Sequence, residues 1–390
     1  MNSLSKPGFG NTENSEEMIN STSDSCDYDS WLSMRGVTDG ERDGYIVREW
    51  HDGREQQLST PASRLENGKW NEPQGDYKPV LSPDGKHIAF FRRYSARYDL
   101  SQPYNTRHES WVAGYRTSII VMDADGSNVR ELVSPTYMNT NPMWTRKKYI
   151  NSSGEEEYRV MWTRMYPMFP NLPRLPAGFH PEAPLKMQFC WADIDNIQGQ
   201  EQCISHPWWP SIFVYSGLKD GRILIRLEGI NQLALLTPNA DKSKKPKVEP
   251  IIFADSLIRG ISNPFKLYHK ISISPDEKKI AYMKVFPSYP GQATLASSYT
   301  KAVLAYADFD ASTNTIANEK IITNFDPTTI QWYPVFTRNN KKIIYGHNGY
   351  PGVTPAGQIY EYDIQTGKTK RISLHKDGFY RYPMPWGSIK

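Results

Sequence analysis

The sequence predicts an all-β fold built from one short unit that recurs along the chain. Aromatic residues make up 13% of the 390 residues, with 24 Tyr and 11 Trp, and aromatic side chains are enriched in strands. The 29 prolines are typical of a chain with many turns. Most directly, several segments repeat one pattern, two short apolar strands joined by a tight turn. This pattern indicates β-hairpins.

The hairpin is clearest in residues 77–93, YKPVLSPDGKHIAFFRR, where a Ser-Pro-Asp-Gly turn separates two apolar strands. The same order returns in residues 268–285, YHKISISPDEKKIAYMKV. Looser copies occupy residues 141–164, 211–227 and 333–346. Hairpins of a second type, with an Asp-Gly or Thr-Gly turn, lie between them at residues 118–133 and 358–374. Each repeating unit therefore holds four strands.

A repeat of four strands predicts a β-propeller. The turns at Ser82 and Thr337 are 255 residues apart over four intervals, so one unit has about 64 residues and the chain about six units. Residues 380–390, YRYPMPWGSIK, look like an inner strand without outer partners, and residues 44–59 look like outer strands without an inner one. We therefore expect the two ends of the chain to complete one blade together and close the ring.

The domain organisation expected is simple: residues 1–25 form a disordered mature N-terminus and residues 26–390 form a single propeller. No apolar stretch approaches the roughly 18 residues of a membrane span, and residues 1–25 lack the basic and apolar regions of a signal peptide. The 46 Lys+Arg nearly balance the 42 Asp+Glu, so no nucleic-acid partner is expected. We expect a monomer, periplasmic or secreted, whose signal peptide has been removed.

One face of the propeller is expected to be cationic and aromatic. The starts of inner strands and the ends of second strands meet there, and they carry Tyr77, Asn141, His269, Tyr333, Tyr382, Arg93, Arg164, Lys284 and His347. The longest loops, 94–116 and 165–185, leave the same face, and long loops in compact domains are usually functional. Rings and basic groups suit sugars that carry carboxylate or sulfate, although Tyr and Arg can also simply fill blade junctions. The predicted partner is an anionic polysaccharide, with substrate contacts from Arg93, Tyr94, Arg97, His269 and Tyr333.

The strands SPDGKHIAF and IIVMDADGSN resemble the TolB-type, WD-repeat-like propeller repeat over nearly the whole chain after residue 40. The chain also resembles the propeller-fold lyases that cleave ulvan, a sulfated rhamnose and uronate polymer. This resemblance implies seven blades, where the period gives six, and a site of two His, one Tyr and one Arg. Matched by type and order, these catalytic residues are His87, His108, Tyr149 and Arg164.

The expected propeller topology does not place these four residues, matched by their order in the sequence, on one face. His108 and Arg164 fall on the face with the long loops, whereas His87 and Tyr149 lie close to turns on the far side. If topology decides, His269 and His347 are the substitutes for the histidine pair. Each isolated histidine also has a structural interpretation, as a hydrogen-bonded residue of the scaffold.

The resulting hypothesis is an exported polysaccharide lyase, similar to ulvan lyases, that leaves 4,5-unsaturated uronate ends by β-elimination. Arg164 would neutralise the substrate carboxylate, and His or Tyr would act as base and acid. No organic cofactor is expected. The alternative is a non-catalytic TolB-like propeller that binds a protein or an anionic glycan. A glycoside hydrolase is disfavoured, because the inner strands start with Tyr, Asn and His in place of paired carboxylates.

The chain has three cysteines, of which Cys190 and Cys203 fall in an outer hairpin. They are equally distant from a turn between residues 196 and 197, so they are expected to lie directly opposite each other. With His180 and His206 they make a Cys₂His₂ set suited to a structural zinc ion. A cross-strand disulfide competes with zinc if the protein is exported, and free thiols are the third possibility.

Overall fold

The computed structural model describes residues 28–36, 44–60, 64–66, 69–71, 73–95, 115–135, 138–167, 185–195, 200–204, 212–227, 232–239, 246–254, 267–285, 302–323, 329–349, 357–374 and 379–386. Within these ranges the chain forms strands and turns, and no helix is long and apolar enough to cross a membrane. The all-β prediction is therefore confirmed for the described part of the chain.

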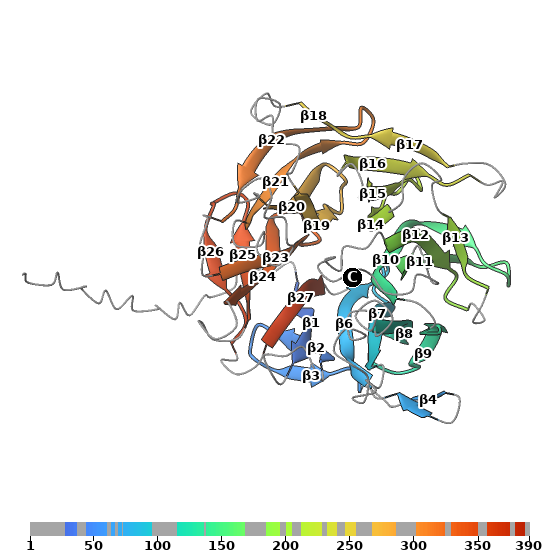
Figure 1. Cartoon of the computed structure of the whole chain (residues 1–390). Coiled ribbons are helices and arrows are strands. Elements are labelled where there is room, and N and C mark those ends of the chain that lie inside the picture. The colour runs from blue at the N-terminus through green and yellow to red at the C-terminus, as the bar shows by residue number, and fades with distance from the viewer. Residues whose placement is uncertain are drawn as a thin grey trace, which may run out of the picture.

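The strands form a ring of small antiparallel sheets (Figure 1). Three sheets have four strands each, and a five-stranded sheet is one such unit with an extra edge strand. The eight-stranded sheet is two units, because one parallel pair, Met138 with Thr117, is all that joins its halves. The described residues thus contain six four-stranded blades, as the repeat length predicts. The seven blades implied by the resemblance to lyases are not found among these residues.

The blades follow one another along the chain, and the strands of each blade are named from the inner strand outwards. The first blade contains β27 (Phe379–Trp386), β1 (Ser30–Gly36), β2 (Tyr45–Trp50) and β3 (Glu55–Gln57). The second contains β6 (Pro73–Leu81), β7 (His87–Ser95), β8 (Tyr115–Asp123) and β9 (Arg130–Val133). The third contains β10 (Met138–Ile150), β11 (Glu156–Pro167), β12 (Leu185–Ala192) and β13 (Gln202–Ile204).

The fourth blade contains β14 (Ile212–Gly217), β15 (Ile223–Leu227), β16 (Gln232–Thr237) and β17 (Lys247–Pro250). The fifth contains β19 (Leu267–Ile273), β20 (Lys279–Val285), β21 (Ala302–Asp310) and β22 (Thr315–Ile321), with β18 (Ile252–Phe253) parallel to β22. The sixth contains β23 (Thr329–Phe336), β24 (Lys342–Gly349), β25 (Gln358–Asp363) and β26 (Thr369–Arg371). A separate two-stranded sheet consists of β4 (Arg64–Glu66) and β5 (Lys69–Asn71).

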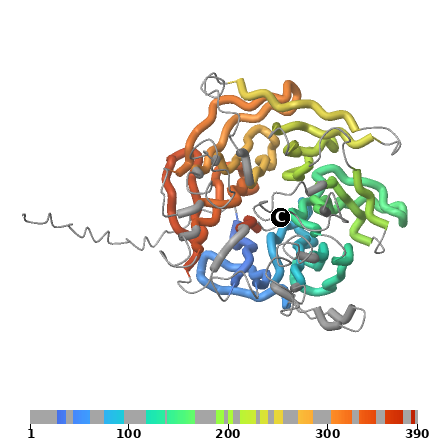
Figure 2. The backbone as a smooth tube through the Cα atoms, viewed as in Figure 1, coloured from blue at the N-terminus to red at the C-terminus, as the bar shows by residue number. Residues whose placement is uncertain are grey.

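The two ends of the chain close the ring. The C-terminal β27 pairs antiparallel with β1, and the red and blue segments lie side by side in Figure 2. The guanidinium of Arg48 lies 3.9 Å from the centroid of Trp386 and 4.6 Å from that of Trp50, so cation–π contacts tie the C-terminal strand to β2. The predicted closure by both termini is confirmed.

The hydrophobic core lies between the blades. Six buried clusters occur among the described residues, and each combines side chains from two neighbouring blades. This follows from the alternation of side chains along a strand: in β7, Ile88 and Phe90 pack towards the first blade, whereas Ala89 packs towards the third. The sixth interface joins Trp31 of the first blade to Ile344 of the last. The ring is therefore held by six similar interfaces.

The inner strands carry a recurrent irregularity that shapes the centre of the ring. In β6, β10, β19 and β23 the pairing with the second strand shifts at the same place, where two residues oppose one. The first residue of each bulge has positive φ, namely Lys78 (53°), Asn141 (59°), Lys270 (53°) and Tyr333 (52°). Such values are uncommon for residues other than glycine, and they often occur at functional sites. Four blades therefore place a bulged residue at equivalent positions.

Candidate functional site

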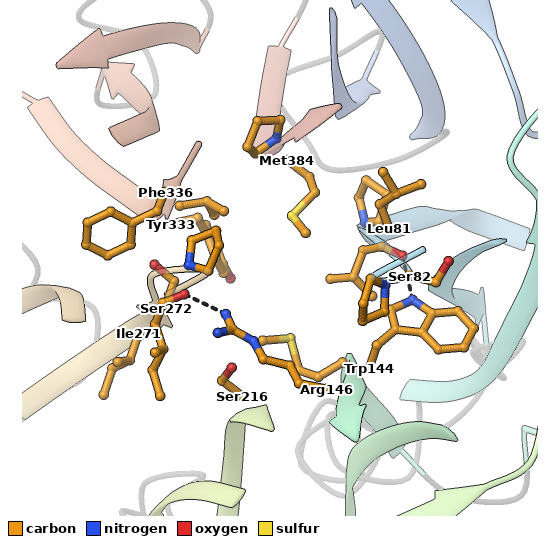
Figure 3. A pocket seen from close by; sticks show the side chains of 18 of the residues that line it. Leu81, Ser82, Trp144, Arg146, Ser216, Ile271, Ser272, Tyr333, Phe336 and Met384 are labelled. Carbon is orange, nitrogen blue, oxygen red and sulfur yellow. Dashed lines mark hydrogen bonds between the residues drawn. The ribbon is translucent and has the colours of Figure 1, made fainter. Parts of the chain in front are cut away.

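A cavity of 380 Å³ lies on the axis of the ring. Residues from all six inner strands or from the hairpin turns after them line it. Figure 3 shows the side chains around this space, with Arg146 and Ser216 on one side and Met384 on the opposite side. A cavity of this size is within the range of small-molecule sites.

The charged residues that line the cavity are all basic. They are Lys78, Arg146, Lys219, Lys270 and Arg338, and no Asp or Glu is among the described residues of the lining. Lys219 and Arg338 are exposed and belong to hairpin turns, so the cavity opens at the face that carries these turns. Lys78 and Lys270 lie on the inner-strand bulges and are half-buried. An anion that enters the cavity meets cations along its depth.

The two arginines of the lining serve the scaffold. Arg146 donates to the carbonyl oxygens of Ser274 (2.7 Å) and Ile273 (2.6 Å), and thus links the third blade to the fifth. Its guanidinium is also 3.6 Å from Glu277. Arg338 of the sixth blade donates to the carbonyl oxygen of Pro83 in the second blade at 3.3 Å. These bonds occupy the arginines with structural contacts, whereas the two bulge lysines have a different environment.

Lys78 and Lys270 contact the same aromatic ring. Their ammonium nitrogens lie 5.4 Å and 4.4 Å from the ring centroid of Tyr333. Burial lowers the pKa of Lys78 well below its ordinary value, and the nearby charge of Lys270 lowers it further. The hydroxyl oxygen of Ser272, another lining residue, is buried and has no hydrogen-bond partner among the described residues. This part of the cavity therefore combines two amines, a phenol and an unengaged hydroxyl.

Three of the four predicted catalytic residues lie among the described residues, and the structure does not bring them together. Arg164 is 8% exposed, and it donates to Asn139 Oδ1 (3.0 Å) and to Glu201 (2.6 Å). Tyr149 pairs with Glu157, seven residues before Arg164 on β11. At about 3.3 Å per residue, Tyr149 and Arg164 lie about 23 Å apart along the hairpin. These two side chains cannot share one small site.

Of the two predicted catalytic histidines, the described part of the structure contains one. His87 follows the hairpin turn of the second blade, and its Nδ1 is 3.1 Å from Asp123 while its ring is 6.3 Å from that of Trp144. This contact with Asp123 agrees with the structural interpretation of His87. His108 lies outside the described residues.

Of the predicted substrate contacts, Tyr333 lines the cavity. Tyr94 is buried, with 4% of its surface exposed, and Arg93 is half-buried in β7. Arg97 and the side chain of His269 lie outside the described part of the chain. Tyr333 is therefore the one residue of the predicted site that the described part of the structure places in the cavity.

The sequence analysis places the cavity-facing position of two inner strands one residue too early, and so it does not identify the two lysines. Tyr77 and His269 were assigned to the inner-strand starts, whereas the residues equivalent to Tyr333 are Lys78 and Lys270. Tyr77 instead stacks on Phe91 with a centroid distance of 5.3 Å. A usable signal was the proline that follows the bulge residue, as in the pairs Lys78-Pro79, Asn141-Pro142 and Tyr333-Pro334. Aligning the repeats on that proline brings Lys78 into register with Tyr333.

The zinc hypothesis requires a correction. Cys190 and Cys203 lie directly opposite each other on β12 and β13, as predicted, and they form a disulfide. Both sulfurs are therefore bonded to each other and are not thiolates, the form that binds zinc. His180 and His206 lie outside the described residues, and no group of three or more metal-ligating side chains occurs in the part that the structure describes. The disulfide, which the sequence left as the competitor of zinc, is what the structure contains.

Comparisons with known proteins agree with this architecture. No family model and no curated protein matches the chain. Among solved structures, hydrazine synthase from Kuenenia stuttgartiensis is similar with a TM-score of 0.57 and 14% identity, over 92% of this chain and 47% of that one. TolB from Acinetobacter baumannii is similar with a TM-score of 0.52 and 13% identity, over 92% of this chain and 67% of that one.

The chain spans about half the length of the hydrazine synthase chain that it matches, 47% by coverage. Identities of 14% and 13% indicate a shared fold and do not transfer an activity. The TolB part of the predicted resemblance is confirmed at the level of the fold, whereas the likeness to ulvan lyases stays a prediction. This chain is a β-propeller that shares its architecture with TolB-like propellers.

Proposed function

We propose that this propeller binds an anionic ligand in its central cavity, and that the ligand is the acidic end of a uronate-containing polysaccharide. The observation that supports this proposal is the charge of the lining, in which all five charged side chains are basic. Basic groups gathered around one cavity repel one another, and those inside it lose hydration. A bound carboxylate or sulfate relieves both costs, and it is the natural complement to such a cavity.

The remaining surface of the cavity suits a sugar. Trp144, Tyr158 and Tyr333 contribute rings, and Tyr333 is half-buried beside the two lysines. Aromatic faces pack against the C–H surfaces of sugar rings by burying apolar area. A polymer end, or a short oligosaccharide, thus finds an acid-binding part and a stacking part in one cavity.

The disulfide between Cys190 and Cys203 supports an exported protein. Disulfides persist in the periplasm and outside the cell, and they are rare in reducing compartments. Polysaccharides of this class would be met in those same compartments. We therefore propose a periplasmic or secreted location, in line with the proposed ligand.

A polysaccharide lyase is the catalytic form of this proposal. β-Elimination needs a cation beside the substrate carboxylate, a base and an acid. Lys270, Lys78 and Tyr333 are groups of these three kinds, and they lie together, whereas Arg164 is held by Glu201. The lyase and the binding module differ in one readout, since only the lyase releases a 4,5-unsaturated uronate with its own ultraviolet absorbance.

Calorimetric titration with oligogalacturonate tests the proposal, with the corresponding carboxyl-reduced, neutral oligosaccharide as the matched ligand. We expect the acidic ligand alone to bind, and we expect Lys270→Met to weaken that binding at least about tenfold, since one charged contact is worth about 1.5–3 kcal/mol. Lys368→Met, at an exposed turn outside the cavity, is the matched control. Equal binding of both ligands, or unchanged affinity in Lys270→Met, would refute the proposal.

A further inference from the structure

We propose that Lys78 is a reactive amine, and that the cavity takes a small carbonyl compound bearing a carboxylate, which condenses with Lys78 Nζ to form an imine. This inference rests on the proposed function, because the basic lining is what holds the carboxylate. It goes further in assigning covalent chemistry to one residue. The compound is defined by two groups, an electrophilic carbonyl and an acid.

The position of Lys78 supports this assignment. Lys78 is the bulged residue of β6, with φ at 53°, and Pro79 follows it. Among the described residues its side chain has no hydrogen bond and no ion pair, and its contact is with the ring of Tyr333 at 5.4 Å. Its side chain is one of those that line the cavity. The amine is thus accessible from the cavity and is not engaged by a carboxylate.

Two other partly buried lysines among the described residues are paired with acids. Lys284 is 2.5 Å from Glu319, and Lys279 is 2.6 Å from Asp308. Each of these ammonium groups is held in an ion pair with a carboxylate. Lys78 is the contrasting case within the same fold, and this contrast provides an internal control.

The surroundings of Lys78 favour its uncharged form, which is the nucleophilic one. The apolar walls formed by Pro79, Val80 and Leu81 remove water, and Lys270 adds a like charge beside the same ring. The titratable groups of the lining, apart from Lys78, come from the third, fourth, fifth and sixth blades, and none is acidic: Lys270, Tyr333, Arg146, Tyr158, Lys219 and Arg338. The lowered pKa of Lys78 agrees with this geometry. Desolvation and a neighbouring cation are the two ways in which a lysine becomes a nucleophile.

The reaction balances without any further reagent. The lone pair of Nζ attacks the carbonyl carbon, and the π electrons of the carbonyl move to its oxygen, which takes a proton. Loss of that oxygen as water, with the second amine proton, leaves an imine between Lys78 and the compound. Lys270 and the hydroxyl of Ser272 are the groups of the lining that are suited to bind the carboxylate.

Reductive labelling of the full chain tests this proposal. The protein is incubated with glyoxylate and cyanoborohydride at neutral pH, and labelled lysines are identified and quantified by peptide mass spectrometry. Burial lowers the pKa of Lys78, and the uncharged amine is the nucleophile, so we expect Lys78 to be labelled at least about tenfold faster than exposed Lys368 and acid-paired Lys284. Propionaldehyde, a neutral aldehyde, should show a weaker preference for Lys78.

Variants and competition identify the site. Lys78→Arg, which cannot form an imine, should lose the fast-labelled position, and Lys270→Met should slow the labelling of Lys78 at neutral pH. Labelling of Lys78 no faster than that of Lys368 would overturn the proposal. Equal preference for Lys78 with glyoxylate and propionaldehyde would overturn the part that assigns a carboxylate to the compound.

The same wild-type protein separates this inference from the proposed function. Oligogalacturonate binding without selective labelling of Lys78 means that the function stands and that the reactive amine is wrong. Selective labelling that neither sulfate nor oligogalacturonate slows, together with no oligogalacturonate binding, means that the anion site itself is wrong. Labelling that both anions slow supports the two together.

Discussion

Replacement of Glu49 by glutamine should abolish a loss of stability that the protein suffers as pH rises. Glu49 lies in β2 and is 0% exposed. Its Oε1 accepts a hydrogen bond from the backbone N–H of Leu374 at 3.4 Å, so the side chain lies where the first blade meets the last. Burial raises its pKa from 4.5 to about 7. The closure of the ring thus contains a carboxyl group whose ionisation the fold opposes.

The sign and size of the effect follow from linkage. The folded state holds the proton of Glu49 more tightly than the unfolded chain, so protonation stabilises the fold. This contribution is complete below pH 4.5 and is lost as the pH rises through about 7. The two pKa values differ by about 2.5, and at 1.36 kcal/mol per pKa unit the loss amounts to at most about 3.4 kcal/mol.

Urea unfolding from about pH 5 to about pH 8.5 measures this loss directly. Glutamine keeps the size of the side chain and carries no charge, so the Glu49→Gln protein should lack the decline. Relative to the parent, its free energy of unfolding should rise by up to about 3 kcal/mol across this pH range. Glu155→Gln, at an exposed turn, is the matched control and should follow the parent. Parallel curves for Glu49→Gln and the parent would refute the reasoning.

Three further changes test the scaffold by urea unfolding. Trp386→Ala should cost about 3–5 kcal/mol, because the C-terminal strand loses a side chain that is 7% exposed. Cys203→Ser should cost about 3 kcal/mol, the cost expected when a short disulfide loop is opened, since Cys190 is 13 residues away. Asp76→Asn should cost about 3–5 kcal/mol, because it leaves the buried guanidinium of Arg92 without its carboxylate, which accepts hydrogen bonds at 2.6 and 2.9 Å.

Each of these changes has its own control. The parent protein under reducing conditions should unfold at the same urea concentration as Cys203→Ser, and a higher midpoint for the reduced parent would contradict the role of the disulfide. Asp52→Asn removes an exposed carboxylate paired with Arg54 and should change stability by less than about 1 kcal/mol. An Asp76→Asn protein as stable as Asp52→Asn would contradict the buried pair, and a Trp386→Ala protein of unchanged stability would contradict the account of ring closure.

The architecture could be predicted from the sequence because the residues that specify a β-hairpin lie close together in the chain. Turn residues and apolar alternation mark each inner pair, and the incomplete patterns at residues 44–59 and 380–390 complement each other. The second strand of the closing blade, β1 at Ser30–Gly36, was missed. It pairs with β27, which lies at the opposite end of the chain, and no turn connects the two strands. No local sequence pattern therefore marks this pair.

The site was predicted less well, because it depends on register and on distant contacts. A bulge moves the inward-pointing position by one residue, so Tyr77 and His269 were chosen in place of Lys78 and Lys270. Arg164 is occupied by Glu201, which is 37 residues away on the outer side of the same blade. No local pattern reveals such a pairing, whereas the opposition of Cys190 and Cys203 follows from a single hairpin.

The most direct test of the central claim is a crystal structure of the protein with bound oligogalacturonate. Electron density for a uronate is expected in the cavity on the ring axis, with a carboxylate oxygen about 3 Å from the ammonium group of Lys270. A cavity without sugar would contradict the proposed function if the oligosaccharide is bound elsewhere, for example beside Arg93 near the C-terminal end of β7.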